Sequence, residues 1–228
     1  MEAHREWLHL PAALRELETL QQQRSSPLGI SAVAAIAAGV SANLSGTDKV
    51  FGAHRSHSHL LGLNNDIRSL FAEILGKDTG FSKGMGGSMH LSDFEHGFVG
   101  SVPIVSGTVP LAVGAAFSGK MMGNDDISVA YLGDGAVNQG QVYESFNMSA
   151  LWSLPVIFII ENNKYGMGTS VNRASAGRSL AERGRAYGIP GMEVDGMNIF
   201  SVREAGKGAL DYTRSGKGPY ILEMKTYR

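Results

Sequence analysis

Two short polar turns hold the side chains in this sequence that are best suited to binding a metal ion. Asp134 lies in a Gly-Asp-Gly turn directly after an apolar, β-prone stretch, and Asn162 and Asn163 directly follow the next such stretch. Between Gly135 and Asn162 there are 26 residues, which is room for one helix and one strand. A carboxylate and an amide oxygen are ligands that a hard cation such as Mg²⁺ prefers. The two turns therefore predict a shared metal site if the fold brings them together.

The Gly-Asp-Gly turn would bind a phosphate group only with the help of that metal ion. Asp134 would repel a bare diphosphate, whereas a Mg²⁺ ion bound to Asp134 would bridge the protein and the diphosphate. Gly133 and Gly135 allow the backbone to approach closely, and the following helix adds the positive end of its dipole. An ordinary turn stays an alternative for each motif taken alone. A nicotinamide-type fingerprint fits less well, because Asn138 stands where its third glycine belongs.

The elements that must position these turns alternate regularly from residue 108 onward. Near-continuous apolar strands alternate with helical patterns, which is typical of a parallel sheet covered by helices on both faces. Ligands bind beyond the carboxyl ends of such strands, so Asp134 and Asn163 are expected to converge from neighbouring strands. The predicted fold class is α/β, in one domain over residues 1–228. The expected helices cover residues 108–122, 139–152, 178–188 and 198–216, and the expected strands cover residues 127–133, 154–162, 192–196 and 219–226.

The first part of the chain is expected to be a helical segment, residues 1–45. One helix is expected over residues 7–22, and a second begins where Ser25 or Ser26 can act as the cap and Pro27 suits the first turn. No internal repeat and no interdomain linker separates this segment from the rest of the chain.

The stretch between this segment and the regular part has weaker signals. Residues 49–62 are expected to be extended or loop-like, which would put His57 and His59 on one face. Residues 64–76 predict a short amphipathic helix ended by a glycine. Residues 77–103 are expected to form a long glycine-rich loop. Its part GFSKGMGGSMH, residues 80–90, is either flexible or a lid that becomes ordered with a cofactor.

The composition restricts the classes of function. The 228 residues carry a formal net charge of -1, so there is no electrostatic case for binding nucleic acid or an anionic membrane. The chain has no cysteine, which excludes a disulfide framework and thiolate metal sites and fits a reducing compartment. No apolar stretch reaches the roughly 18 residues that span a bilayer, and the first residues lack an apolar signal core. We therefore expect a cytoplasmic protein.

The two turns together resemble a known signature. Gly-Asp-Gly, about 26 residues and Asn-Asn is the pattern of thiamine diphosphate enzymes, and residues 133–171 read GDGAVNQGQVYESFNMSALWSLPVIFIIENNKYGMGTSV. This text is similar to the alpha subunit of the thiamine-dependent, decarboxylating component of 2-oxo acid dehydrogenase complexes, the group with pyruvate, branched-chain and acetoin dehydrogenases. The similarity runs from about residue 48 to the end, through HRSHSH, GKDTGFSKGMGGSMHL, VPIVSGTVPLAVGAAF and AYGIPGMEVDGM. The resemblance implies the diphosphate-binding half of a thiamine diphosphate-binding fold.

The resemblance also implies a set of metal ligands. Asp134, Asn163 and the backbone carbonyl of Tyr165 match the positions that bind Mg²⁺ in this family. These three residues and Gly133 would therefore form the part of the cofactor site around the metal ion. The implied cofactors are thiamine diphosphate and Mg²⁺.

Further residues match positions that contact the organic cofactor in the family. Gly135 and Ala136 line the diphosphate, and Arg55 matches a diphosphate-contacting arginine. His54 stands where many members have a cofactor-contacting tyrosine. Val105 falls in the segment that meets the aminopyrimidine ring.

Histidines near the cofactor are candidates for catalysis. An imidazole can stabilise or protonate a substrate oxyanion. His57 is the first candidate and His90 the second. A loop cluster without catalytic function and a zinc site made by His54, His57 and His59 stay alternatives, although no nearby carboxylate has obvious ligand spacing for zinc.

The resemblance implies that this chain needs a partner. Thiamine catalysis uses a carboxylate against the pyrimidine nitrogen, and in the family a separate beta subunit supplies that glutamate. We therefore expect an α₂β₂ heterotetramer that oxidatively decarboxylates a 2-oxo acid, with transfer of the acyl group to a lipoyl-bearing acyltransferase or a similar acceptor. The chain alone is expected to be inactive.

Three departures from the family pattern leave other functions open. The text SSPLGISA replaces an aromatic and histidine segment, Pro103 stands where dehydrogenase members often have glycine, and the chain stops at MKTYR, before a histidine-bearing loop. A transketolase-like or acetoin-cleaving subunit is the first alternative. A truncated, non-catalytic paralogue that acts as a scaffold is the second, and the retained Asp134, Asn163 and Tyr165 argue against it.

Overall fold

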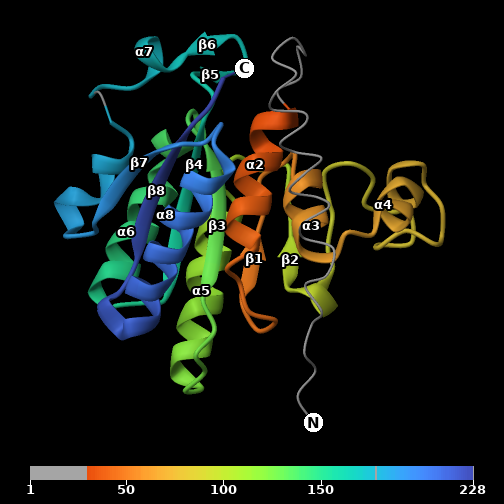
Figure 1. Ribbon diagram of the computed structural model, residues 1–228, viewed down its shortest axis with the longest axis horizontal. Coiled ribbons are helices and arrows are strands. Elements are labelled where there is room, and N and C mark those ends of the chain that lie inside the picture. The colour runs from red at the N-terminus through yellow and green to blue at the C-terminus, as the bar shows by residue number, and fades with distance from the viewer. Residues whose placement is uncertain (1–29, 178, 228) are drawn as a thin grey trace.

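The centre of the protein is a six-stranded sheet in which every strand pair is parallel (Figure 1). The computed structural model describes residues 30–177 and 179–227. The strands follow the order β2-β1-β3-β4-β8-β7 across the sheet. Their bounds are β1 Lys49–Phe51, β2 Phe98–Gly100, β3 Ser128–Gly133, β4 Val156–Asn162, β7 Gly191–Asp195 and β8 Tyr220–Lys225. The expected parallel α/β sheet is thus confirmed.

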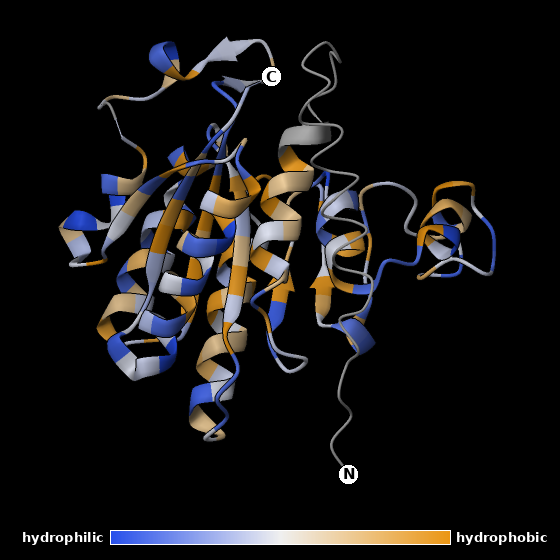
Figure 2. Ribbon diagram, viewed as in Figure 1, coloured by the Kyte–Doolittle hydropathy of each residue, from blue (hydrophilic) through white to orange (hydrophobic). Residues whose placement is uncertain are grey.

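Helices cover both faces of this sheet (Figure 1). The side chains of β3 alternate between two buried clusters: Val129 and Tyr131 pack with α2, α3 and α8, whereas Ala130 and Leu132 pack with α5 and α6. Figure 2 shows that the central strands are mainly hydrophobic, as strands buried on both faces must be. The helices are α2 Ile30–Ser41, α3 His57–Asn64, α4 Ile67–Ile74, α5 Thr108–Met121, α6 Gly140–Leu151, α7 Val171–Ala174 and α8 Ile199–Tyr212.

Shorter elements lie in the connections. An antiparallel hairpin of two short strands follows β4, and 3-10 turns precede β2, α6 and β7. A π-helical turn, Thr213–Lys217, extends α8 toward β8. The hairpin strands are β5 Tyr165–Gly166 and β6 Thr169–Ser170, and the 3-10 turns are η1 Phe94–His96, η2 Ala136–Asn138 and η3 Ala181–Tyr187.

Side chains at the helix starts explain where two of these helices begin. Asp66 accepts a hydrogen bond from the backbone N–H of Ser69 and caps α4. Asn198 accepts from the backbone N–H groups of Phe200 and Ser201 and caps α8. No helix within the described ranges is long and apolar enough to span a bilayer.

The structure corrects the sequence predictions in the first half of the chain. Residues 57–64 form the helix α3, so the expectation of an extended or loop-like stretch holds only for β1 and the turn after it. The expected loop over residues 77–103 contains the short strand β2, which pairs with β1. In the second half, residues 181–187 form a 3-10 helix rather than an α-helix. The expected helix over residues 7–22 and its neighbour's start lie outside the described residues.

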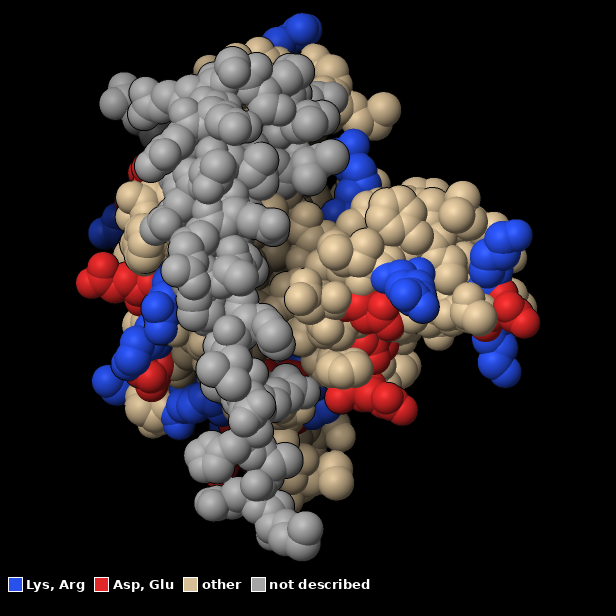
Figure 3. Space-filling view, turned by 45° about the vertical axis from the view of Figure 1, so that its right-hand side comes forward, with Lys and Arg blue, Asp and Glu red and all other residues tan. Residues whose placement is uncertain are grey.

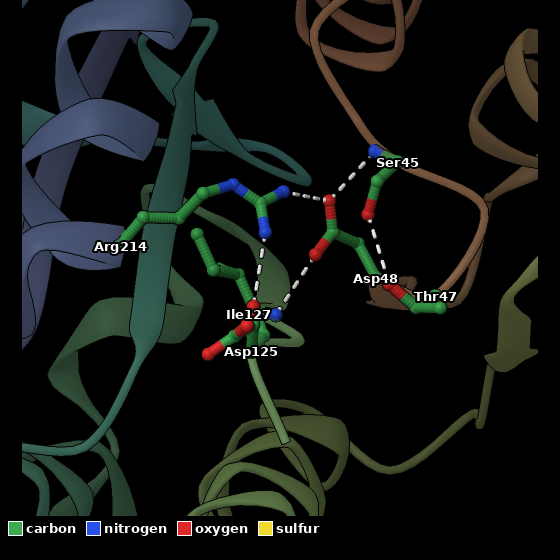
Figure 4. A network of polar contacts seen from close by, with 6 residues as sticks. All are labelled: Ser45, Thr47, Asp48, Asp125, Ile127 and Arg214. Atoms are coloured by element: carbon green, nitrogen blue, oxygen red, sulfur yellow. Dashed lines mark hydrogen bonds and ion pairs between the residues drawn. The ribbon is translucent and has the colours of Figure 1, made fainter.

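A buried carboxylate ties the end of the α8 region to the start of β1 (Figure 4). The Asp48 side chain is fully buried and its Oδ2 atom lies 2.5 Å from Arg214 Nη2. The same carboxylate accepts hydrogen bonds from the backbone N–H of Ser45 at 2.7 Å and of Ile127 at 2.9 Å. Arg214 also donates to the Asp125 carbonyl oxygen at 2.9 Å. These contacts lie at the amino ends of β1 and β3, opposite the edge at which Asp134 lies.

Candidate functional site

The register of β3 and β4 brings the two polar turns to the same edge of the sheet. Gly133 pairs with Glu161, so Asp134 and Asn163 follow directly beyond a paired end. Asp134 is 3% exposed, and its Oδ1 atom accepts a hydrogen bond from the Gly135 N–H at 2.7 Å. Asn163 is half-buried, and its Oδ1 atom accepts from the Tyr165 N–H at 3.0 Å. The expected placement of the two turns at neighbouring strand ends is thus what the structure has.

Close packing of two glycines joins the turn after β3 to the hairpin after β4. A Cβ atom added to Gly135 would lie 3.4 Å from the Gly166 Cα atom, so the two backbones meet without side chains between them. A cavity of about 90 Å³ lies beside this contact, with Asp134 and Thr169 in its wall. The two oxygen donors at this edge of the sheet, the buried Asp134 carboxylate and the Asn163 amide oxygen, are of the kind that a hard divalent cation prefers.

Asn138 holds the segment that follows the hairpin, a role the sequence did not reveal. Its Nδ2 atom donates to Ser175 Oγ at 2.8 Å. Arg183 fixes the next residues, since it donates to the Tyr143 hydroxyl at 2.6 Å and to the Ala176 carbonyl oxygen at 2.9 Å. Asn138 therefore closes one side of the cavity, which explains why a polar residue rather than a glycine stands at this position.

Two side chains fix the segment that carries Val105 against the Gly-Asp-Gly turn. Ser106 has the left-handed φ of 60°, which costs a residue other than glycine about 1 kcal/mol. Its hydroxyl donates to the Ala136 carbonyl oxygen at 2.7 Å. Gln141 Nε2 donates to the Val105 carbonyl oxygen at 2.9 Å. The segment with Val105 is thereby attached to the turn with Ala136, and both residues are predicted to contact the cofactor. The sequence analysis did not identify the positioning roles of Ser106 and Gln141.

Asn162, the first residue of the Asn-Asn pair, has a structural role. Its Nδ2 atom donates to Glu223 Oε1 at 2.7 Å, and its Oδ1 atom accepts from the Lys164 N–H at 3.0 Å. Glu223 is fully buried and accepts three further hydrogen bonds, from Ser179 Oγ and from the N–H groups of Leu180 and Ala181. The buried Glu223 carboxylate thus fixes the end of β4, and Asn163 is the one of the pair that is available to a ligand.

We expect the two asparagines to respond differently to the same substitution. Asn162→Asp replaces a donor by a second carboxylate against Glu223, and the repulsion should lower the free energy of unfolding by about 3 kcal/mol. Asn163→Asp keeps the oxygen that accepts from Tyr165 and should change it by no more than about 1 kcal/mol. Urea denaturation of both variants measures the difference, and equal losses would contradict the structural role of Asn162.

His54 and Arg55 lie just beyond the carboxyl end of β1, which is the neighbour of β3 in the sheet. Both side chains are exposed. Partial burial and the positive charge of Arg55 lower the pKa of His54, which favours a neutral imidazole. The strand order therefore puts these two residues at the same edge of the sheet as Asp134, and their contacts with a cofactor stay predictions.

His57 and His59 do not share a face, so this expectation was wrong. They lie on α3, where residues two apart point about 200° away from each other. His57 Nε2 lies 2.9 Å from Ser88 Oγ and 3.1 Å from the Ser88 carbonyl oxygen. His59 is buried, its Nε2 atom lies 2.9 Å from Glu161 Oε1, and its ring centroid lies 3.9 Å from that of Tyr131.

This placement removes the basis for the zinc alternative, which needs the imidazoles together. In the part of the chain that the structure describes, no group of three or more His, Cys, Asp or Glu side chains is arranged to hold a metal ion. His90 is exposed within the glycine-rich loop. The catalytic roles of His57 and His90 stay predictions.

Known proteins are similar to this chain over most of its length. The model of a family described as dehydrogenase E1 component matches residues 15–228. The pyruvate dehydrogenase E1 component subunit alpha of Rhizobium meliloti (strain 1021) is 52% identical over 194 residues, which are 85% of this chain and 56% of that protein. The mitochondrial subunit of the same name from Dictyostelium discoideum is 48% identical over 194 residues, 85% of this chain and 50% of that protein. The chain thus spans about half the length of the curated relatives it matches.

Solved structures share the fold. An X-ray structure of a candidate thiamin diphosphate-dependent enzyme from Mycobacterium smegmatis superposes with a TM-score of 0.59 at 17% identity, over 86% of this chain and 32% of that one. At this identity the likeness shows the fold alone. The family match and the relatives named alpha subunit confirm the resemblance that the sequence motifs carry. The chain belongs to the family of dehydrogenase E1 components.

Proposed function

We propose that this chain binds Mg²⁺ and thiamine diphosphate as the alpha subunit of an enzyme that oxidatively decarboxylates a 2-oxo acid, pyruvate by the names of the relatives. The observation that carries this proposal is the position of the buried Asp134 carboxylate and of Asn163, which directly follow the neighbouring parallel strands β3 and β4. Thiamine diphosphate, when bound, supplies an electron sink for the carbanion that decarboxylation leaves. An acyl group would then pass to a lipoyl-bearing acyltransferase.

The residues of this chain would hold the cofactor and control protons around it. Asp134, Asn163 and the carbonyl oxygen of Tyr165 would bind the metal ion. Arg55 and the backbone of residues 135–136 would bind the diphosphate, with His54 beside them. These roles draw support from the common sheet edge at which β1, β3 and β4 end.

Two further parts of the chain would act at the reacting end of the cofactor. Val105, which Gln141 fixes through its carbonyl oxygen, would contact the aminopyrimidine ring. His57 and His90 would hold or donate a proton at the substrate oxygen. His57 is the stronger candidate because Ser88 fixes its ring.

A beta subunit would supply the carboxylate for the pyrimidine ring in an α₂β₂ assembly. Exposed apolar side chains on α5 and α6, two helices that pack together, and on the residue after each helix support a partner, since large apolar patches on a surface mark interfaces. The Phe117 and Trp152 rings lie 5.1 Å apart within this set. Its members are Leu111, Phe117, Met121, Met122, Met148, Leu151 and Trp152. A cytoplasmic location stays an expectation, since the relatives include one named mitochondrial.

Thermal melting tests the cofactor part of the proposal. A ligand at 100 times its dissociation constant stabilises a protein by about 2.7 kcal/mol. We expect a rise in melting temperature that needs Mg²⁺ and thiamine diphosphate together, in the chain alone or in its complex with the beta subunit. No rise in melting temperature with either preparation would reject the proposal. A scaffold that binds no cofactor would give that result.

Turnover tests the partner part. The purified chain should not decarboxylate any 2-oxo acid of a panel, and addition of the beta subunit should restore activity with one of them. Activity of the chain alone would contradict the need for a partner. Acetoin cleavage or two-carbon transfer by the complex, without 2-oxo acid oxidation, would favour the other thiamine reactions.

A further inference from the structure

The glycine-rich loop after α4 is wound around one buried carboxylate. The Glu73 side chain belongs to α4, is 0% exposed, and accepts hydrogen bonds from four backbone N–H groups of the loop. The donors to Oε2 are Ser82 at 2.7 Å and Gly84 at 2.9 Å, and the donors to Oε1 are Gly86 at 2.6 Å and Gly87 at 3.2 Å. Helix α4 and this loop project from the body of the protein (Figure 1), and Figure 3 shows mostly uncharged side chains on the projection.

The shape of the loop depends on glycine at two points around this carboxylate. A Cβ atom on Gly80 would lie 2.5 Å from the Glu73 Cα atom, where no side chain fits. Gly84 has a φ of +74°, which other residues rarely adopt. The pattern of glycines is therefore matched to an anion inside the loop, and that anion is a side chain of the same protein.

The environment of Glu73 keeps its carboxylate charged. Burial raises the pKa of Glu73, but the backbone N–H groups of the loop outweigh it, and the pKa lies below its ordinary value. Hydrogen bonds to a charged acceptor are roughly twice as strong as those between neutral groups. The carboxylate thus holds the loop more firmly than a neutral side chain could.

The loop contacts His57, the first candidate for catalysis, through Ser88. Ser88 directly follows Gly87, the last residue bound by Glu73. Its Oγ atom and its carbonyl oxygen lie 2.9 Å and 3.1 Å from His57 Nε2. Because a carbonyl oxygen only accepts hydrogen bonds, the contact with the Ser88 carbonyl oxygen favours the tautomer in which His57 Nε2 carries the proton. In this tautomer Nδ1 is the acceptor.

We propose that Glu73 is a positioning residue: it shapes the loop over residues 82–88 from inside and thereby holds the His57 ring with Nε2 protonated. The catalytic meaning of this arrangement rests on the proposed function, whereas the arrangement itself does not. If the proposal holds, the loop has this shape before any cofactor binds, and the choice between a flexible loop and a lid ordered by the cofactor stays a prediction.

Nuclear magnetic resonance of the cofactor-free chain tests this proposal. Two-bond ¹H–¹⁵N spectra report which imidazole nitrogen carries the proton, and the exposed His90 serves as an internal reference. In the wild-type chain His57 should be protonated at Nε2 alone. In Glu73→Ala and Glu73→Gln its signals should move to averaged values like those of His90. The four loop amides should exchange about ten- to hundredfold faster, which corresponds to the loss of a hydrogen bond to a charged group.

Rescue and a matched control separate positioning from general stability. Formate supplies a carboxylate without a side chain, so it should restore the His57 signals and the slow amide exchange in Glu73→Ala. Leu70→Ala removes a buried side chain from the same helix without touching the carboxylate. It should lower the melting temperature and leave the His57 signals as in the wild-type chain.

Three results would overturn the proposal. The first is an unchanged His57 spectrum in both Glu73 variants, and the second is unchanged exchange of the loop amides. The third is the same change of the His57 signals in Leu70→Ala, which would assign the effect to stability alone. Because no cofactor is present, a failure of the proposed enzyme function would leave these outcomes unaffected.

Discussion

Replacing Asp134 by alanine should abolish the stabilisation that Mg²⁺ and thiamine diphosphate together give the protein. Asp134 is the anionic member of the proposed ligand set and lies at the end of β3, 3% exposed. If the affinity falls about a hundredfold, a concentration that stabilises the wild type by about 2.7 kcal/mol would stabilise the variant by only about 0.4 kcal/mol. Differential scanning calorimetry of each protein, with and without both ligands, measures this difference.

A control variant must remove the same charge elsewhere. Asp211→Ala is suitable, because Asp211 is exposed on α8 and pairs with Lys207 at 2.6 Å. It should keep the full stabilisation by the two ligands. A full ligand effect in Asp134→Ala would show that the metal ion, if bound, is held elsewhere, and the proposed cofactor site would have to be abandoned.

The largest loss of stability is expected for Asp48→Ala, at the opposite edge of the sheet. The substitution leaves Arg214 without its partner carboxylate and leaves the N–H groups of Ser45 and Ile127 without their acceptor. Breaking a buried ion pair in this way costs about 3 to 5 kcal/mol. Urea denaturation should therefore show a lower midpoint with an unchanged slope.

Asp211→Ala again provides the comparison. The ion pair between Asp211 and Lys207 is exposed, and such surface pairs contribute about 0 to 1 kcal/mol to the free energy of unfolding. A loss in Asp48→Ala no larger than the loss in Asp211→Ala would mean that water replaces the Asp48 carboxylate at little cost. The network in Figure 4 would then have no special role in stability.

The main features of the fold and of the metal site were predictable because they depend on local patterns. Asp134 and Asn163 each follow a continuous apolar strand, and one crossover helix between two parallel strands brings their ends to the same edge. Strand adjacency alone therefore placed the two turns. The sharing of an ion between them stays a prediction.

Two elements of the first half were missed because their signals are short. The helix α3 begins after Ser56, whose hydroxyl donates back to the Ala53 carbonyl oxygen, and its first three residues, His-Ser-His, carry no helical periodicity. Strand β2 has only three residues and ends in Gly100. Its place in the sheet follows from its pairing with β1, and no local sequence pattern predicts this pairing.

The roles of Glu73 and Asp48 could not be predicted from the sequence for another reason. Glu73 binds amides 9 to 14 residues further along the chain, and these contacts exist only once the loop has its path. Asp48 and Arg214 are 166 residues apart. Neither spacing corresponds to a helical or strand period, so no local pattern marks either carboxylate as buried.

The position of β8 has a consequence for the synthesis of this protein on the ribosome. Although it follows β7 in the sequence, β8 lies between β4 and β7 and pairs with both. Until Tyr220–Lys225 emerges, the nascent chain therefore exposes an open edge on β4, and Asn162 has no Glu223 to bind. Unpaired edges of this kind are sites of aggregation, so we expect the growing chain to need a chaperone until β8 is inserted.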